Sequence, residues 1–436
     1  MSCPSLAHAR PSPHQPHDHH VSLSLTLLHL TPSSCPCPSL RFVLRLCPHC
    51  ASKESFAQAS HQTLSIARPK NIAMNRNCWL PQGLAANAGS NNKPPGPDLS
   101  SYRLPDDDAL RIFNDEILPA ELPPLSADPS ASSRGDGDAR PLALLVVGQT
   151  GAGKTILAQA LLEALERRRA SASPQHPIQP PAHLIADTYK TYHPQYTRLM
   201  LSTPHLASPA TGPDARRWLA MAAREVARRR LDVLLESACR HPDDFTQLAA
   251  LFRDNDAAYR VEVVVLAVPA PLSRLGILMR FYEKLPEGQS RNLPVRLTPR
   301  KVHDDSYAGL LHAAAFLDGK TGTVSSGAAA ADQVLVVRRG NLVVARAEET
   351  GVAEALRAER ERPLTQAEMK TALDDVQKLS THEEAKEQLD EVRAMLQPLL
   401  KEADASAGQF PALLPLKFTT DGGSDSGQNV LRLGKV

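Results

Sequence analysis

The part of this chain that could fold is almost free of cysteine. Of the seven cysteines in 436 residues, six lie within residues 1–97, and only Cys239 lies beyond them. A single cysteine excludes a disulfide framework and favours a reducing compartment, so we expect a cytoplasmic protein. The cysteine pairs of the first segment do not repeat a known zinc-ligand spacing, and we predict no zinc site there.

The chain also lacks a dominant charge and a long hydrophobic run. Its 49 Lys and Arg residues are nearly balanced by 47 Asp and Glu residues, which excludes a strong general attraction to nucleic acid or to an anionic membrane surface. The stretch VSLSLTLLHL is too short and too polar to span a bilayer. We therefore expect neither nucleic acid nor a membrane among the partners.

Acidic residues are scarce at the N-terminus. Residues 1–97 contain two acidic residues against eight Lys or Arg, together with 13 of the 37 prolines and eight of the 16 histidines. Such a segment buries too little apolar surface to offset the entropy that is lost on ordering. We predict that residues 1–97 are disordered.

What the chain does have is a glycine-rich octet, GQTGAGKT, which fits the pattern G-x-x-x-x-G-K-[ST]. An apolar run of strand type, 142–147, precedes it, and leucines at helical spacing follow it. A strand, a glycine loop and a helix N-terminus together hold phosphate oxygens with backbone N–H groups and the positive end of the helix dipole. We predict that this loop binds the phosphates of a nucleotide through Gly148, Gln149, Thr150, Gly151, Ala152, Gly153, Lys154 and Thr155.

Two side chains of the octet have specific tasks in this interpretation. Lys154 would reach the β- and γ-phosphates, and Thr155 would ligate Mg²⁺. The alternative is a glycine-rich turn that binds nothing.

Strand-like and helix-like segments alternate beyond the octet. Apolar segments at 231–237 and 260–269 have the character of buried strands, and a helix is expected over 214–230. This alternation predicts an α/β protein of the P-loop NTPase class, with a mainly parallel sheet covered by helices on both faces. Ligands lie at the carboxyl ends of the strands in such sheets, which directs attention to Asp187 and Glu236.

The pattern changes after Asp318. The stretch QVLVVRRGNLVVARA predicts a small C-terminal β-hairpin around Arg339 and Gly340. A helical hairpin is expected over 365–398, with capping boxes at Thr365 with Glu368 and at Thr381 with Glu384. The predicted parts are a disordered segment at 1–97, a P-loop domain at 98–320, a C-terminal hairpin and helical extension at 330–402, and a disordered tail at 403–436.

Five stretches occur in an order and spacing that resemble the zeta toxin family: VVGQTGAGKT, IADTYKTYHPQY, LLESACRHPDDF, LAVPAPLSRLGILMRFYE and RLTPRKVHDDSYAGL. The resemblance covers roughly residues 102–318. Zeta toxins are P-loop kinases of bacterial toxin–antitoxin systems and of their relatives. The resemblance implies ATP- and Mg²⁺-dependent phosphorylation of a sugar hydroxyl of a nucleotide-sugar, UDP-N-acetylglucosamine, and an antitoxin-like inhibitor as a possible partner.

The same resemblance implies roles for single residues. Asp187 matches the catalytic base, and Lys154, Arg280 and Arg296 match residues that act on the transferring phosphate. Glu236 and Arg240 match an element that contacts the acceptor sugar. This chain has Ala238 where the family element carries a threonine, which leaves the acceptor open.

Several alternatives remain at this point. The acceptor could be NAD instead of a UDP-sugar, or the chain could be an ATP-binding switch that transfers no phosphate. Asp187 could be a helix cap, and Glu236 could pair with a nearby arginine. Arg291 and Arg300 compete with Arg296 for its role. The residues Lys190 and His193 are candidates for lining the acceptor cleft, whereas His303 and Asp304 are expected to orient a helix.

Overall fold

The structure is a computed structural model that describes residues 98–434 except for eight gaps, at 123–139, 173–179, 254–257, 291–294, 320–329, 348, 402–409 and 420–426. The predicted disorder of residues 1–97 lies outside the described residues. All described residues belong to one compact unit, 92–436. Within the described part of the chain, none of the helices combines the length and the hydropathy needed to cross a bilayer.

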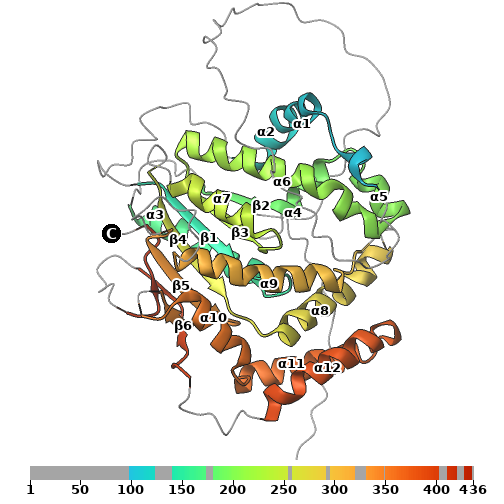
Figure 1. The fold of residues 1–436 in the computed structure, drawn as a ribbon, viewed down its shortest axis with the longest axis vertical. Coiled ribbons are helices and arrows are strands. Elements are labelled where there is room, and N and C mark those ends of the chain that lie inside the picture. Colours follow the sequence, from blue (N-terminus) through green and yellow to red (C-terminus); the bar gives the residue numbers. More distant parts are fainter. Residues whose placement is uncertain are drawn as a thin grey trace, which may run out of the picture. The chain divides into compact units, whose positions relative to one another are not determined.

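The centre of this unit is a seven-stranded sheet with the strand order β2-β3-β1-β4-β5-β6-β7 (Figure 1). The first five strands are parallel, and β6 and β7 are antiparallel to their neighbours. Their bounds are Leu142–Val147 (β1), Ala182–Ile185 (β2), Val233–Ser237 (β3), Arg260–Leu266 (β4), Gln333–Arg338 (β5), Leu342–Arg346 (β6) and Leu414–Pro415 (β7). This confirms the predicted mainly parallel sheet and the C-terminal hairpin.

The central strands are apolar in sequence because both of their faces are buried. All six residues of β1 are buried, and alternate residues point to opposite faces of the sheet. Leu145 and Val147 belong to one hydrophobic cluster, whereas Leu144 and Val146 belong to a second cluster on the other face. The sheet is therefore the middle layer of three.

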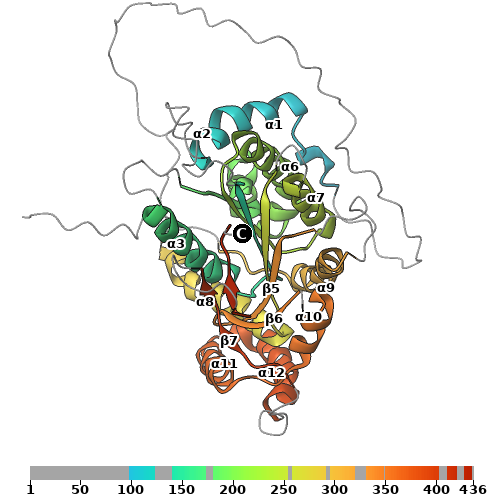
Figure 2. The same cartoon turned by 90° about the vertical axis from the view of Figure 1, so that its left-hand side faces the viewer.

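Helices from separate parts of the chain cover each face of the sheet (Figure 2). The Leu145 face packs against α6 (Pro204–Arg229), α7 (Pro242–Arg253), α9 (Arg300–Leu317) and α10 (Val352–Glu361). The Leu144 face packs against α3 (Lys154–Ala172), α8 (Ala270–Ser290), α11 (Gln366–Leu379) and α12 (Lys386–Lys401). The predicted cover of helices on both faces is confirmed.

The shorter helical elements lie near the ends of these layers. They are η1 (Ser100–Tyr102), α1 (Asp106–Ile112), η2 (Phe113–Ile117), α2 (Leu118–Glu121), α4 (Ala186–Tyr189), η4 (Lys190–Tyr192), α5 (Tyr196–Ser202) and η5 (Glu383–Ala385). The indole of Trp218 on α6 donates to the carbonyl of Ala109 at 2.8 Å, which docks α1 onto the outer side of α6. The helix that was expected over 214–230 begins ten residues earlier, with Pro204 in its first turn.

The predicted hairpin turns sharply between β5 and β6. Gly340 and Asn341 have φ of 76° and 58°, which is the left-handed pair that a tight hairpin turn with right-handed strand twist requires. Arg338, the last residue of β5 and two residues before Gly340, is fully buried and donates to the carboxylates of Glu359 on α10 and Glu368 on α11. The end of β5 is thereby fixed to the C-terminal helices.

One of the two expected capping boxes is present. The Thr365 hydroxyl accepts the Glu368 N–H at 3.2 Å, and the Glu368 carboxylate accepts the Thr365 N–H at 3.0 Å. The second box is wrong, because α12 begins only at Lys386 and the Thr381 hydroxyl donates to the Lys378 carbonyl at the end of α11. The Thr381 side chain thus contacts the end of α11, and η5 lies between it and the start of α12.

The tail expected to be disordered over 403–436 contains short strands. In addition to β7, the strands β8 (Lys417–Phe418) and β9 (Val430–Leu431) pair with each other in parallel. The side chains of Leu431 and Leu433 are buried, and the buried Glu262 carboxylate on β4 accepts the Leu433 and Gly434 N–H groups at 2.8 Å. The prediction of disorder is therefore wrong for the described parts of the tail. It was based on the Gly, Ser and Asp content of the segment, which does not show that a few apolar residues become buried.

Candidate active site

The glycine octet forms a loop between β1 and α3, and we refer to residues 148–155 as the phosphate loop. Gly151 and Gly153 have φ of 83° and 97°, a backbone conformation that glycine adopts without strain. A Cβ on Gly151 would lie 2.0 Å from the carbonyl oxygen of Ser273 on α8. The loop therefore packs so closely against α8 that glycine is required at this position.

Buried polar side chains connect the phosphate loop to the start of α8 and to α9. The Gln149 amide donates to the Val268 carbonyl at 2.6 Å and to the Ser273 hydroxyl at 3.3 Å. Ser273 also lies 2.8 Å from the buried His303 imidazole on α9. Gln149 thus supports the loop with its side chain and does not point that side chain toward a nucleotide.

A second contact joins α9 to the loop. The Thr150 N–H donates to the Ser306 hydroxyl at 3.1 Å, and Ser306 in turn donates to the His303 carbonyl at 2.8 Å. His303 further contacts Asp304 at 3.0 Å. The sequence-based prediction that His303 and Asp304 orient this helix agrees with their positions, whereas Ser306 was not singled out.

Lys154 is the first residue of α3 and folds back over the phosphate loop. Its ammonium donates to the carbonyls of Gly148 at 2.8 Å and Gln149 at 3.2 Å. Burial lowers the pKa of Lys154, while the nearby carboxylates of Glu236 and Asp187 act in the opposite direction. The adjacent Thr155 is exposed at the helix N-terminus, where the first N–H groups have no acceptor within the helix.

Asp187 follows β2 by two residues and lies in the helical turn α4. Its carboxylate is 82% exposed and accepts a hydrogen bond from the Lys190 ammonium at 2.5 Å. Lys190 is held in turn by the Ser208 hydroxyl of α6 at 2.6 Å. Neighbouring protein atoms displace water from the Asp187 carboxylate, and this desolvation raises its pKa. The cations of Lys190, Lys154 and Arg280 lower the pKa by more, so it lies below its ordinary value. Asp187 is therefore an ionised carboxylate at neutral pH.

The Glu236–Arg240 element lies at the end of β3, beside β1. Glu236 is buried, and its carboxylate is 2.9 Å from the His183 imidazole of β2. The expected alternative for Glu236 was an arginine partner, and the partner is a histidine instead. The Arg240 Nε lies 3.7 Å from a carboxylate oxygen of Asp305 on α9.

The hydroxyl of Ser237 points back into this element. It accepts the Cys239 N–H at 3.2 Å and lies 3.7 Å from the Cys239 thiol. Cys239 has φ of 52°, and burial raises the pKa of its thiol to about 12. The side chain of Ser237 thus stabilises the turn that carries Ala238.

Two arginines complete the constellation. Arg280, on α8, donates to the Thr298 hydroxyl at 3.1 Å. Burial lowers the pKa of Arg296, which also interacts electrostatically with Tyr196, Asp187, Arg240 and Arg280. Among the described residues, the buried Nε atoms of Arg240 and Arg296 have no hydrogen-bond partner.

These interactions bring the predicted residues into one region. Lys154 is electrostatically coupled to Asp187, Glu236 and Arg280, and Arg296 is coupled to Asp187 and Arg280. Of the competitors of Arg296, Arg300 instead pairs with Glu391 on α12, and Arg291 lies outside the described residues. The buried His193 contacts the Tyr102 carbonyl and Asp214, so its contacts are structural.

Some residues of this region were not identified from the sequence. Tyr196 lies in the stretch HPQY, and its interactions with Asp187 and with Arg296 alter its pKa, which burial raises. The close approach of Gly276 and Arg339 to the phosphate loop was also missed. Tyr196 could have been found, because it belongs to a quoted motif, but the other two make contacts that no local pattern indicates.

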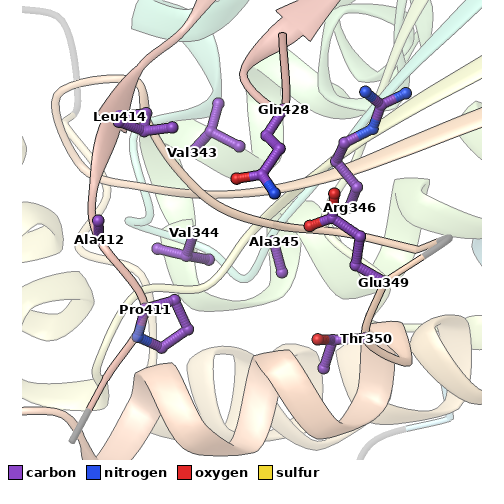
Figure 3. Close-up of a pocket in the computed structure, with 10 residues that line it drawn as sticks. All are labelled: Val343, Val344, Ala345, Arg346, Glu349, Thr350, Pro411, Ala412, Leu414 and Gln428. Atoms are coloured by element: carbon purple, nitrogen blue, oxygen red, sulfur yellow. The ribbon is translucent and has the colours of Figure 1, made fainter. Parts of the chain in front are cut away.

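A separate cavity of about 210 Å³ lies at β6, where the tail passes it (Figure 3). Its lining residues are Val343, Val344, Ala345, Arg346, Glu349, Thr350, Pro411, Ala412, Leu414 and Gln428. No residue of the phosphate loop or of the acceptor side lines it. The described residues also contain no group of three or more His, Cys, Asp and Glu side chains placed to hold a metal ion.

The chain is similar to one known protein family and, more distantly, to several solved structures. The chain matches the family described as "Zeta toxin" over residues 130–350, which is just over half of its length. No curated protein matches the chain. A solved structure from the PezAT chromosomal toxin–antitoxin system of Streptococcus pneumoniae is 18% identical, covering 65% of this chain and 99% of that one, with a TM-score of 0.47.

A chain from the AvrRxo1-ORF1:-ORF2 complex with ATP is 14% identical, covering 67% of this chain and 83% of that one, with a TM-score of 0.35. These two similarities are low, and the assignment depends on the match over residues 130–350. The strand order, the glycine loop and that match agree, and the chain belongs to the zeta toxin family of kinase-like P-loop proteins.

Proposed function

We propose that the protein transfers the γ-phosphoryl group of ATP to a sugar hydroxyl of a nucleotide-sugar, with UDP-N-acetylglucosamine as the leading acceptor. One observation carries this proposal: the Lys154 ammonium and the Arg280 guanidinium lie close enough to the Asp187 carboxylate to lower its pKa. A phosphate-binding cation and an ionised carboxylate at one point are what phosphoryl transfer to an alcohol needs.

The phosphate loop fits a nucleotide triphosphate. A Cβ on Gly153 would meet nothing within 4 Å, so there is open space over the loop at the positive end of the α3 dipole. Lys154 has only to exchange its contacts with the loop carbonyls for the β- and γ-phosphates. Thr155 presents its exposed hydroxyl beside Lys154 and would contribute to holding Mg²⁺, which neutralises phosphate charge when bound.

Asp187 suits the acceptor side of the reaction. Lys190 contacts Oδ1 of the carboxylate, which leaves Oδ2 to accept the proton of an acceptor hydroxyl. As the hydroxyl oxygen bonds to the γ-phosphorus, the bond from that phosphorus to the β-γ bridging oxygen breaks and the proton passes to Asp187. Because the pKa of Asp187 is lowered, the carboxylate is ionised at neutral pH and can both orient the hydroxyl and accept its proton as the bond to phosphorus forms.

The arginines supply charge stabilisation. Arg280 and Arg296 interact electrostatically with Asp187, and a guanidinium group stabilises the negative charge on the equatorial oxygens of the transferring group. The buried Nε atoms of Arg240 and Arg296 supply further donors for an anionic acceptor. A switch that only binds ATP would need none of these groups.

Ala238 supports a second acceptor. The family element has a threonine hydroxyl at this position, and the neighbouring Ser237 hydroxyl is engaged with Cys239. Ser237 is thus poorly placed to replace the missing contact, and NAD remains a candidate acceptor for the same chemistry.

A panel of UDP-sugars and NAD, each incubated with the protein, ATP and Mg²⁺, tests the proposal by mass spectrometry. We expect an added phosphate on UDP-N-acetylglucosamine. If NAD is phosphorylated and the UDP-sugars are unchanged, the proposed acceptor is wrong but the proposed kinase activity is supported. ATP binding that depends on Lys154 without transfer to any member of the panel would instead indicate the switch.

Membership of the family also suggests a protein partner. We include in the proposal an antitoxin-like inhibitor that covers the phosphate loop. Such an inhibitor should compete with ATP for the chain, and equal ATP affinity in its presence and absence would contradict this part.

A further inference from the structure

Arg339, in the turn between β5 and β6, reaches the phosphate loop from a distant part of the sequence. One nitrogen of its guanidinium, Nη2, donates to the carbonyls of Gly151 at 2.8 Å and Leu272 at 2.7 Å. Gly151 belongs to the phosphate loop, and Leu272 lies in the first turn of α8. A single charged donor therefore connects the loop, α8 and the end of β5.

A glycine in the middle of α8 leaves the space for this contact. A Cβ on Gly276 would lie 2.6 Å from the Arg339 Nη2 and 2.8 Å from the Gly151 carbonyl oxygen. Glycine inside a helix costs about 1 kcal/mol relative to alanine, so its presence here needs a local reason. The close approach of the Arg339 guanidinium and the loop backbone is that reason.

The neighbouring arginine points the other way and is fixed independently. Arg338 is fully buried between Glu359 and Glu368, which belong to the C-terminal helices. Two consecutive arginines thus connect the C-terminal helices, through the end of β5, to the phosphate loop.

From this geometry we propose that Arg339 is a positioning residue for the phosphate loop, and that it holds the Gly151 carbonyl so that the loop N–H groups face the nucleotide. The proposal rests on the proposed function only in its use of ATP as ligand. In this proposal the C-terminal hairpin contributes to nucleotide binding, although Arg339 and Gly151 are 188 residues apart in the sequence.

The test compares Arg339→Met with wild type, with Arg339→Lys, and with Arg357→Met as the matched control on the exposed side of α10. We expect the Kd for ATP to rise about tenfold or more in Arg339→Met, because a charged hydrogen bond to the loop is lost. The KM for the acceptor should stay unchanged, Arg339→Lys should recover part of the affinity, and Arg357→Met should bind like wild type. ATP affinity within twofold of wild type in a folded Arg339→Met protein would overturn the proposal.

Two further measurements keep the outcome decisive. If Arg339→Met does not fold, Gly276→Ala places a methyl group in the same junction with Arg339 retained; wild-type ATP affinity in that folded variant would overturn the proposal. Amide exchange of residues 148–153 in the nucleotide-free protein is independent of the proposed function. Faster exchange in Arg339→Met supports the positioning role even if wild type binds no ATP, and unchanged exchange contradicts it.

Discussion

The two sides of the candidate site are built differently. The phosphate loop is one continuous octet whose geometry is set by backbone, by two glycines with positive φ, and by buried partners such as Gln149 and Ser306. The acceptor side consists of single side chains from α4, the end of β3, α8 and the segment before α9. Among the described residues, no group forms a hydrogen bond with the buried Nε atoms of its Arg240 and Arg296. The phosphate loop is thus one continuous segment, whereas the acceptor side depends on side chains from four separate segments.

The largest effect should come from the loop. Lys154→Ala removes the cation that would neutralise the β- and γ-phosphates, and we expect phosphate transfer to be abolished and ATP binding to weaken. Steady-state transfer and equilibrium binding of ATP measure the two effects. Transfer at the wild-type rate would mean that the loop is not the active site.

Asp187→Asn should affect the acceptor side alone. The amide keeps the size of the carboxylate but accepts no proton at neutral pH, so transfer should fall by roughly 10²–10⁴-fold while ATP binding is retained. The ratio of the two measurements separates the two sides of the site. A silent substitution would favour the non-catalytic switch.

Ala238→Thr sharpens the question of the acceptor. The threonine restores the hydroxyl of the family element, and one hydrogen bond to a substrate is worth about 1 kcal/mol, or roughly fivefold in kcat/KM. We expect this gain for UDP-N-acetylglucosamine and no gain for NAD, measured with each acceptor separately. An equal gain for both would show that position 238 does not contact the part of the acceptor in which they differ.

The smallest effect concerns the stability of the support under the loop. Burial lowers the pKa of His303, although Asp304 opposes this, so the folded state favours the neutral imidazole. The unfolded chain then binds more protons below its ordinary pKa of about 6.5, and stability is lost as the pH falls from there through the folded pKa.

His303→Gln tests this effect by chemical denaturation at several pH values. We expect a loss of about 1 kcal/mol at pH 8 from the contact with Ser273, and a weaker dependence on pH below 6.5. If the free energy of unfolding of His303→Gln changes with pH between 6.5 and 5 as steeply as that of wild type, groups other than His303 cause the acid sensitivity.

The sequence predicted the phosphate loop well because all of its determinants are contiguous. The strand, the glycines and the helix start follow one another in residues 142–172, and the structure has them in that order. Arg280 and Arg296 were proposed only through the resemblance, because no local pattern brings together residues so far apart, whereas Asp187 was also indicated by its place after a strand-like segment. The stretch HLIAD, residues 183–187, indicates a short strand that includes Asp187, but β2 ends at Ile185 and a helical turn carries the carboxylate.

Contacts between distant segments could not be predicted at all. Arg339 and Gly151 are 188 residues apart, and their contact depends on the register of the hairpin and on the space at Gly276. The order in the tail was missed for a related reason. Leu431 and Leu433 are buried only because β8, β9 and the Glu262 carboxylate are in place, and composition does not report such partners.

The Glu368 carboxylate serves two structures at once, since it closes the capping box of α11 and pairs with the buried Arg338 at the end of β5. Unfolding α11 alone would therefore leave a buried guanidinium without one of its partners, a state that costs several kcal/mol. The C-terminal helices and the sheet should consequently melt as one cooperative unit. In a urea titration followed by tryptophan fluorescence and by far-ultraviolet circular dichroism, we expect coincident midpoints, although Trp218 lies on α6 at the opposite face of the sheet.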